Sequence, residues 1–164
     1  MPTIFSKIIS REISGHIVAE DDRFIAFLDI MPLVMGHVLV VPKKEVDYIF
    51  DIDDDTLAAI NVFAKKVAHA IKKAVPCKRI GVAIIGLEVP HAHIHLIPMN
   101  TVGDINFTKP KLTPTQEELT LVTTKIRLAF EEPRTRAGAR VQLTPAASRP
   151  DVTAPKNSCA SAFR

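Results

Sequence analysis

The stretch His91-Ala92-His93-Ile94-His95-Leu96-Ile97-Pro98, with three histidines at strict two-residue spacing, most constrains what this chain can fold into. Successive side chains of a β-strand point to opposite faces of the sheet. The spacing therefore predicts a strand over residues 91–98 with all three imidazoles on one face and Ala92, Ile94 and Leu96 directed into a core. Imidazoles are costly to bury, so a row of three indicates a functional site rather than an ordinary structural strand.

Length and composition predict one domain, or one domain with a tail. The 164 residues are 47% hydrophobic and 24% charged, which is typical of soluble globular proteins. No apolar run approaches the roughly 20 residues of a transmembrane helix, and the N-terminus lacks the basic and apolar segments of a secretory signal. Cys77 and Cys159 lie far apart without CxxC spacing. We therefore expect a reduced, cytoplasmic setting and no membrane partner.

The basic character of the chain is confined to its C-terminal end. Residues 1–130 contain 15 Lys and Arg and 15 Asp and Glu, so their charges cancel, and the net charge of +3 lies in residues 131–164. That segment lacks apolar periodicity and has too few large apolar side chains to offset the entropy of ordering. We expect a domain over residues 1–130 and a disordered extension over residues 131–164, for which the alternative is a weak contact with an anionic partner. Nothing in the charge of the domain indicates a nucleic-acid partner.

The first half of the chain predicts a short helix, three strands and a long helix. Apolar spacing favours the short helix within residues 3–14. β-Branched and aromatic runs predict strands at residues 16–20, 23–30 and 37–42, and the last of these is expected at the centre of a sheet. Capping side chains from Asp53 and an apolar stripe predict a helix that ends before Pro76. His69 falls opposite that stripe and is expected to face solvent.

The second half predicts a hairpin and a final helix. A strand over residues 79–85 is joined by a short connection to the strand at 91–98, so we expect antiparallel pairing. The stretch Thr113-Pro114-Thr115-Gln116 predicts a capping box with Pro114 at the first position of an amphipathic C-terminal helix.

Three chemistries use histidines on one strand face. Zinc binds imidazoles, but His91 and His95 lie roughly 13 Å apart along a strand, so a further ligand such as His37 is required. General acid–base catalysis needs only one histidine. In nucleophilic attack on phosphorus, one neutral imidazole attacks while its neighbours orient it and donate hydrogen bonds to the phosphoryl oxygens. The row of histidines fits the third chemistry best, with the attacking ring in the middle and His37 as a fourth ring.

The triad stretch resembles the His-φ-His-φ-His-φ-φ signature of the histidine-triad (HIT) superfamily, in which φ is an apolar residue. Other blocks resemble segments of its Hint-like branch, in the same order: Thr3-Ile4-Phe5-Ser6-Lys7-Ile8-Ile9, Glu20-Asp21-Asp22-Arg23, Ala26-Phe27-Leu28-Asp29-Ile30 and Gly36-His37-Val38-Leu39-Val40-Val41-Pro42-Lys43.

The resemblance implies an α+β fold with a five-stranded antiparallel sheet, a long central helix and a C-terminal helix. It also implies a homodimer whose sheets join, and hydrolysis of a purine nucleotide without a cofactor or a metal. Nucleotide phosphoramidate hydrolysis is the expected activity. The alternatives are a dinucleoside polyphosphate hydrolase of the same superfamily, a nucleotide-binding or scaffold protein of low turnover, and a zinc-dependent hydrolase.

The positions that match the family imply individual roles. His93 is expected to attack the α-phosphorus and form a nucleotidyl-imidazole intermediate, which water hydrolyses. His95 is expected to contact phosphate oxygens, His91 and His37 to position the site, and Asp29 to bind the ribose hydroxyls. Further nucleotide-binding positions are expected at Phe5, Ile8, Phe27, Ile30, Glu88 and Val89; for Phe5, Ile8, Phe27 and Ile30 the alternative is a plain core role.

The segment just before the triad, Gly86-Leu87-Glu88-Val89-Pro90, departs from the family pattern. Leu87 occupies a position where many members have Gln, and Glu88 replaces a Ser or Thr that helps the leaving group in close relatives. An ionised carboxylate donates no hydrogen bond. We hypothesise that Glu88 favours phosphoramidates over dinucleoside polyphosphates, because it attracts an ammonium leaving group and repels an anionic one.

Overall fold

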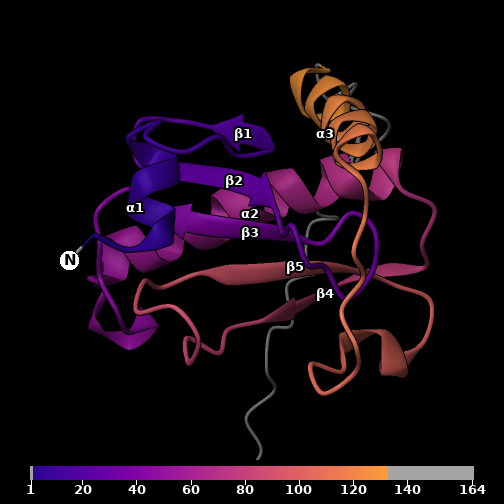
Figure 1. Ribbon diagram of the computed structural model, residues 1–164. Helices are drawn as coiled ribbons and strands as arrows, with labels where there is room; N and C mark the ends of the chain where they lie inside the picture. Colours follow the sequence, from indigo (N-terminus) through magenta and orange to yellow (C-terminus); the bar gives the residue numbers. More distant parts are fainter. Residues whose placement is uncertain (1, 133–164) are drawn as a thin grey trace, which may run out of the picture. The chain divides into compact units, whose positions relative to one another are not determined.

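Five antiparallel strands form one sheet in the computed structural model, which describes residues 2–132 (Figure 1). The strand order is β1-β2-β3-β5-β4. The strands are β1 (Ile17–Glu20), β2 (Phe24–Leu28), β3 (Val38–Pro42), β4 (Arg79–Ala83) and β5 (Ile94–Met99). The helices are α1 (Ile4–Ile9), α2 (Asp54–Ala74) and α3 (Gln116–Glu131), with short 3₁₀ turns η1 (Ile49–Asp51) and η2 (Val102–Ile105).

The predicted α+β class, the five-stranded antiparallel sheet, the long helix and the C-terminal helix are confirmed. The predicted extension over residues 131–164 falls almost entirely outside the described residues, which end at Glu132. No helix within the described part of the chain is long and apolar enough to cross a membrane.

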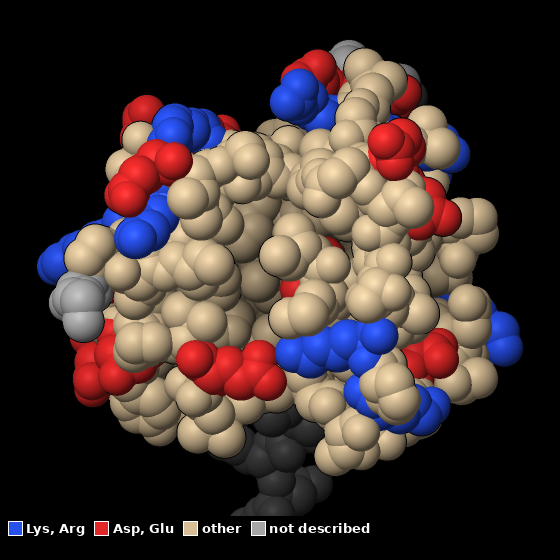
Figure 2. Space-filling view, in the orientation of Figure 1, with Lys and Arg blue, Asp and Glu red and all other residues tan. Residues whose placement is uncertain are grey.

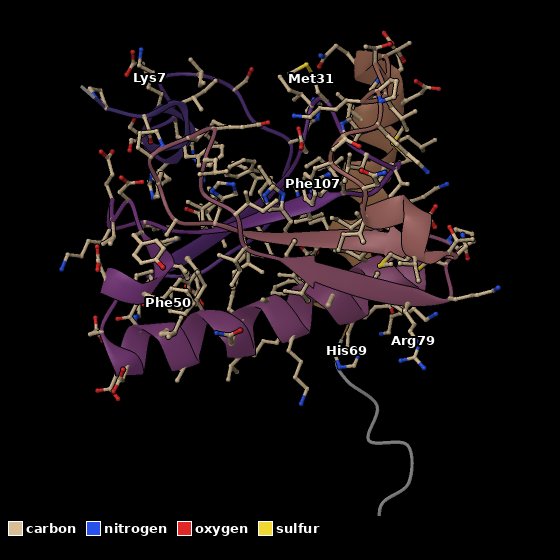
Figure 3. All side chains as sticks on the ribbon, turned by 90° about the horizontal axis from the view of Figure 1, so that it is seen from below. Lys7, Met31, Phe50, His69, Arg79 and Phe107 are labelled. Carbon is tan, nitrogen blue, oxygen red and sulfur yellow. The ribbon has the colours of Figure 1, made fainter. Side chains whose placement is uncertain are left out.

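Helix α2 crosses one face of the sheet, behind the strands in Figure 1, and α3 packs beside it. The Asp53 side chain accepts the Thr56 N–H at 2.9 Å and caps α2, as predicted. His69 is exposed, on the side of α2 that faces away from the sheet (Figure 3). Each large apolar side chain buried here contributes roughly 1.5–3 kcal/mol to stability. The strand contribution to this core comprises Val18, Ala19, Phe24, Ala26, Leu28, Val38, Val40, Ile94 and Leu96.

Helix α1 covers part of the opposite face of the sheet. Phe5 and Ile8 pack against the alternate residues of β2 and β3, which are Ile25, Phe27, Leu39 and Val41. Because both faces are covered, all five residues of β2 and of β3 are buried. This explains the nearly continuous apolar runs in the sequence and confirms the predicted central position of β3.

A tight turn at Gly36 directs the chain into β3. Gly36 has φ +89°, and a Cβ at this position would lie 2.9 Å from Val75 Cγ2 and 3.3 Å from Pro98 Cγ. Both the backbone conformation and the close approach of α2's end and β5 therefore require glycine. The turn places His37 directly before β3.

Strand β5 begins three residues later than predicted, so His91 and His93 precede it. The ladder between β3 and β5 ends at the pair Val40 and Ile94. Pro42 has no N–H with which to continue the ladder, and Ala92 N–H instead donates to Val46 O at 2.7 Å.

Two further boundaries also differ from the predictions. Strand β4 ends at Ala83, and its pairing with β5 is antiparallel, as expected. Helix α3 is capped by Thr115 together with Glu118, so the capping box predicted at Thr113 with Pro114 is wrong. A start at Thr115 places Glu117 and Glu118 in the first turn, where the helix dipole favours negative charge.

Candidate active site

Four histidines gather on the face of the sheet opposite α2. The register pairs His95 with Leu39 of β3, so the His95 side chain shares the face of the α1 cluster. His93 and His95 rings lie 4.7 Å apart between centroids, and His37 and His95 rings lie 5.2 Å apart. His37, His91, His93 and His95 are all buried. The predicted burial of Ala92, Ile94 and Leu96 is also confirmed.

The hydrogen bonds of His37 fix the tautomer of His95. The Leu33 N–H donates to His37 Nδ1 at 3.4 Å, so His37 carries its proton on Nε2. His37 Nε2–H then donates to His95 Nδ1 at 3.0 Å. A neutral imidazole has one N–H and one lone pair, so His95 keeps its proton on Nε2. His95 therefore presents a hydrogen-bond donor.

His93 has the opposite tautomer. Its Nδ1 lies 2.7 Å from the backbone carbonyl oxygen of His91. A carbonyl oxygen only accepts hydrogen bonds, so Nδ1 carries the proton and Nε2 carries the lone pair. The site thus combines a nucleophilic nitrogen on His93 with a donor N–H on the neighbouring His95.

His91 is held by the start of helix α1. His91 Nε2–H donates to Pro42 O at 2.8 Å, and the Thr3 hydroxyl donates to His91 Nδ1 at 3.0 Å. Thr3 is also the N-cap of α1, where its oxygen accepts the Ser6 N–H at 3.1 Å. The Ser6 hydroxyl in turn donates to Glu45. This chain of hydrogen bonds fixes the backbone whose carbonyl orients His93.

Burial favours the neutral forms of His37, His91 and His95. The loss of hydration, with a smaller effect of nearby positive charges, lowers the pKa of His37 from 6.5 to about 4 and that of His95 to about 3. Burial also lowers the pKa of His91, against the hydrogen bond to Pro42. Burial raises the pKa of Asp29. The 3.5 Å contact between Asp29 Oδ2 and His37 Nδ1 is therefore no ion pair at neutral pH.

A cavity of about 210 Å³ opens beside the histidines. It brings together five of the predicted site residues: Asp29, His37, Glu88, His93 and His95. On the face of the molecule that Figure 2 shows, Lys, Arg, Asp and Glu gather mainly around the rim, and the centre is largely uncharged.

Other predicted site residues do not line this cavity. Phe5, Ile8 and Phe27 belong to the apolar cluster under α1, with Val89 packed against it. The Phe5 ring meets the His93 ring edge-to-face at 5.1 Å, so Phe5 contacts the triad from the core side. Ile30 is 58% exposed. Their part in binding a base stays a prediction.

Sequence reasoning assigned no site role to six cavity-lining residues: Ile85, Gly86 and Leu87 just before the triad, and Leu33, Phe107 and Lys111 farther away in the sequence. The Phe107 ring packs edge-to-face on His95 at 5.0 Å and lies on the opposite side of the sheet from α2 (Figure 3). Lys111 Nζ lies 3.3 Å from Glu88 Oε2. Leu33, Phe107 and Lys111 come from loops, which show no periodicity to mark them. The only local signal was a lysine between two prolines in a polar loop.

Metal binding has no preformed site among residues 2–132. No three His, Cys, Asp or Glu side chains in this part of the chain are placed to hold an ion. The ring nitrogens that face one another are instead joined by hydrogen bonds, as between His37 and His95.

Comparison with known proteins places this histidine arrangement in a class. The HIT domain profile matches residues 10–102. An uncharacterized HIT-like protein of Borreliella burgdorferi is 38% identical over 102 residues, which cover 58% of this chain and 73% of that protein. The adenosine 5′-monophosphoramidase of Saccharomyces cerevisiae is 38% identical over 96 residues, which cover 58% of this chain and 61% of that protein.

A solved structure agrees with these sequence matches. The crystal structure of a Hit-like protein from Bartonella henselae, described as involved in cell-cycle regulation, matches with a TM-score of 0.66 and 38% identity. The match covers 77% of this chain and 95% of that chain. Because the HIT domain profile matches more than half of the chain, this protein belongs to the HIT family.

The low pKa values of His37 and His95 predict acid sensitivity. Below pH 6.5 the unfolded chain binds protons at both residues, whereas the folded chain binds them only near pH 4 and pH 3. The free energy of unfolding should therefore fall as the pH drops from 7 to 5, by about 1–2 kcal/mol for each histidine. Urea denaturation at the two pH values measures this fall, which His95→Gln should reduce. Equal stability at pH 5 and pH 7 would contradict the burial of neutral imidazoles.

Proposed function

We propose that this protein is a nucleotide phosphoramidate hydrolase in which His93 is the nucleophile. The observation that carries the proposal is the tautomer of His93, whose Nδ1–H is tied to the His91 carbonyl and whose Nε2 therefore holds a free lone pair. Neighbouring His95 offers a donor to a phosphoryl oxygen. The name of the yeast relative, a monophosphoramidase acting on an adenosine compound, supports the same activity.

The proposed reaction has two steps. His93 Nε2 forms a bond to the α-phosphorus while the P–N bond breaks, and the amine leaves with the bonding electron pair and takes up a proton. Water then attacks the nucleotidyl-imidazole, which releases a nucleoside monophosphate and restores His93. The His91 carbonyl accepts the Nδ1–H throughout, so it stabilises the positive charge that develops on the imidazole.

Asp29 is proposed to bind the ribose hydroxyls. Asp29 lines the cavity, and one of its carboxylate oxygens accepts the Met31 N–H at 2.9 Å, which orients the carboxylate.

A purine base in the substrate stays a prediction. A homodimer and a cytoplasmic location stay predictions as well, and the molar mass in solution tests the first. Strand β4 lies at an edge of the sheet, where a second copy of the chain could pair with it. Val82 on this strand and Ile84 and Ile85 after it are exposed.

Replacement of the nucleophile should abolish turnover. We expect His93→Asn to lower the rate of adenosine 5′-phosphoramidate hydrolysis by about 10³-fold or more, because the variant lacks the imidazole nitrogen that forms the intermediate. The matched control is His69→Asn, an exposed histidine on α2, which should keep the wild-type rate. Full turnover by His93→Asn would refute the nucleophile. AMP binding by a wild-type protein that turns over no faster than His93→Asn would favour the low-turnover binding protein.

The choice of leaving group separates the two enzyme candidates. Glu88 places a carboxylate at the cavity, which should disfavour an anionic leaving group. We therefore expect the purified protein to hydrolyse adenosine 5′-phosphoramidate faster than a diadenosine polyphosphate, measured as kcat/KM for each. Faster cleavage of the diadenosine polyphosphate would instead support the dinucleoside polyphosphate hydrolase.

A further inference from the structure

The loop between η2 and α3 is fastened to the candidate site on both sides of Lys111. On one side, the Phe107 ring packs edge-to-face on His95 at 5.0 Å. On the other, the Leu112 N–H donates to Pro32 O at 2.8 Å, next to the cavity-lining Leu33. The loop thus presents Lys111 to the cavity from a fixed backbone. It lies outside residues 10–102, which match the family profile.

Without Lys111, the residues that line the cavity would offer no lysine or arginine to compensate the negative charge of a phosphate. Burial keeps His37 and His95 neutral at pH 7, so neither ring supplies a positive charge. The carboxylates of Asp29 and Glu88 line the cavity, and among its lining residues Lys111 is the single lysine or arginine. An anionic phosphoryl group needs a cation or a set of hydrogen-bond donors when it leaves water.

We propose that Lys111 binds the phosphate of the nucleotide, and that Glu88 holds the lysine at the cavity until phosphate displaces it. The inference rests on the proposed function, since it names the residue that recognises the charged part of the substrate. Lys111 Nζ lies 3.3 Å from Glu88 Oε2. The Lys111 side chain is 29% exposed, whereas that of Glu88 is 78% exposed.

The difference in exposure between Lys111 and Glu88 indicates which side chain moves when a phosphate binds. Glu88 loses little when its carboxylate turns from the ammonium group toward water at the cavity edge, because an exposed ion pair contributes little to stability. Lys111 stays at the cavity, because Phe107 and Leu112 fix its loop. Phosphate binding thus exchanges one anion for another at the same ammonium group. The site consequently selects 5′-phosphorylated nucleosides over nucleosides, and Glu88 competes with the phosphate.

Calorimetric titration with AMP and with adenosine tests the proposal. AMP is the expected product, so it binds without turnover, and adenosine lacks only the phosphate. We expect Lys111→Met to weaken AMP binding about 10- to 100-fold, as for loss of a hydrogen bond between charged groups. Adenosine binding should change by less than about twofold, which also shows that the variant is folded. Lys111→Arg should retain most of the AMP affinity, and Glu88→Gln should tighten AMP binding about 2- to 5-fold.

Lys109 provides the matched control. It lies on the same loop, is exposed, and donates to Gly103 O at 2.9 Å instead of lining the cavity. Lys109→Met should bind AMP like the wild type. AMP affinity of Lys111→Met within twofold of wild type, or an equal loss of adenosine affinity, would overturn the role of Lys111 alone. Weaker AMP binding by Glu88→Gln would overturn the competition. Failure of the wild-type protein to bind AMP would overturn the proposed function together with this inference.

Discussion

The hydrogen bond from His37 Nε2 to His95 Nδ1 is the interaction on which the candidate site depends. It joins the residue that enters β3 to a residue of β5, and the central pairing of these strands holds both rings in place. A buried imidazole nitrogen without a partner costs about 1–3 kcal/mol, so this bond makes the burial of two neutral histidines tolerable. The bond also determines which nitrogen of His95 carries a proton.

The rest of the structure supports this arrangement from two directions. On one side α2 covers the sheet, and the turn at Gly36 passes against its end to deliver His37. On the other side α1 packs over β2 and β3, and its N-cap Thr3 donates to His91. Among the four rings, only His93 keeps a ring nitrogen, Nε2, without a hydrogen-bond partner in residues 2–132. The four imidazoles thus differ in which ring nitrogen carries the proton, and this difference gives His93 a free lone pair and His95 a donor N–H.

Most helices and strands could be predicted from the sequence, whereas fewer of the residues that line the cavity could be. Apolar β-branched runs identified β2 and β3 because both faces of these strands are buried, and Asp53 marked the start of α2. The start of β5 could not be predicted, because it depends on Pro42, which faces the triad only in the folded chain. The capping boxes at Thr113 and Thr115 overlap, and the structure uses the second, which places Glu117 and Glu118 in the first turn of α3. Phe107 carries no local signal, and Lys111 is marked only by its position between two prolines, because long-range contacts such as that of Leu112 with Pro32 bring their loop to the histidines.

The protonation pattern of the histidine rings is the central claim, and long-range ¹H–¹⁵N correlation NMR of the imidazole nitrogens at pH 7 tests it most directly. We predict a proton on Nδ1 and a bare Nε2 for His93, and protons on Nε2 for His37, His91 and His95. The chemical shift patterns of His37, His91 and His95 should be those of neutral rings, because burial lowers their pKa values. A proton on Nε2 of His93, or an imidazolium at His37 or His95, would contradict the assignment of His93 as a nucleophile prepared by its neighbours.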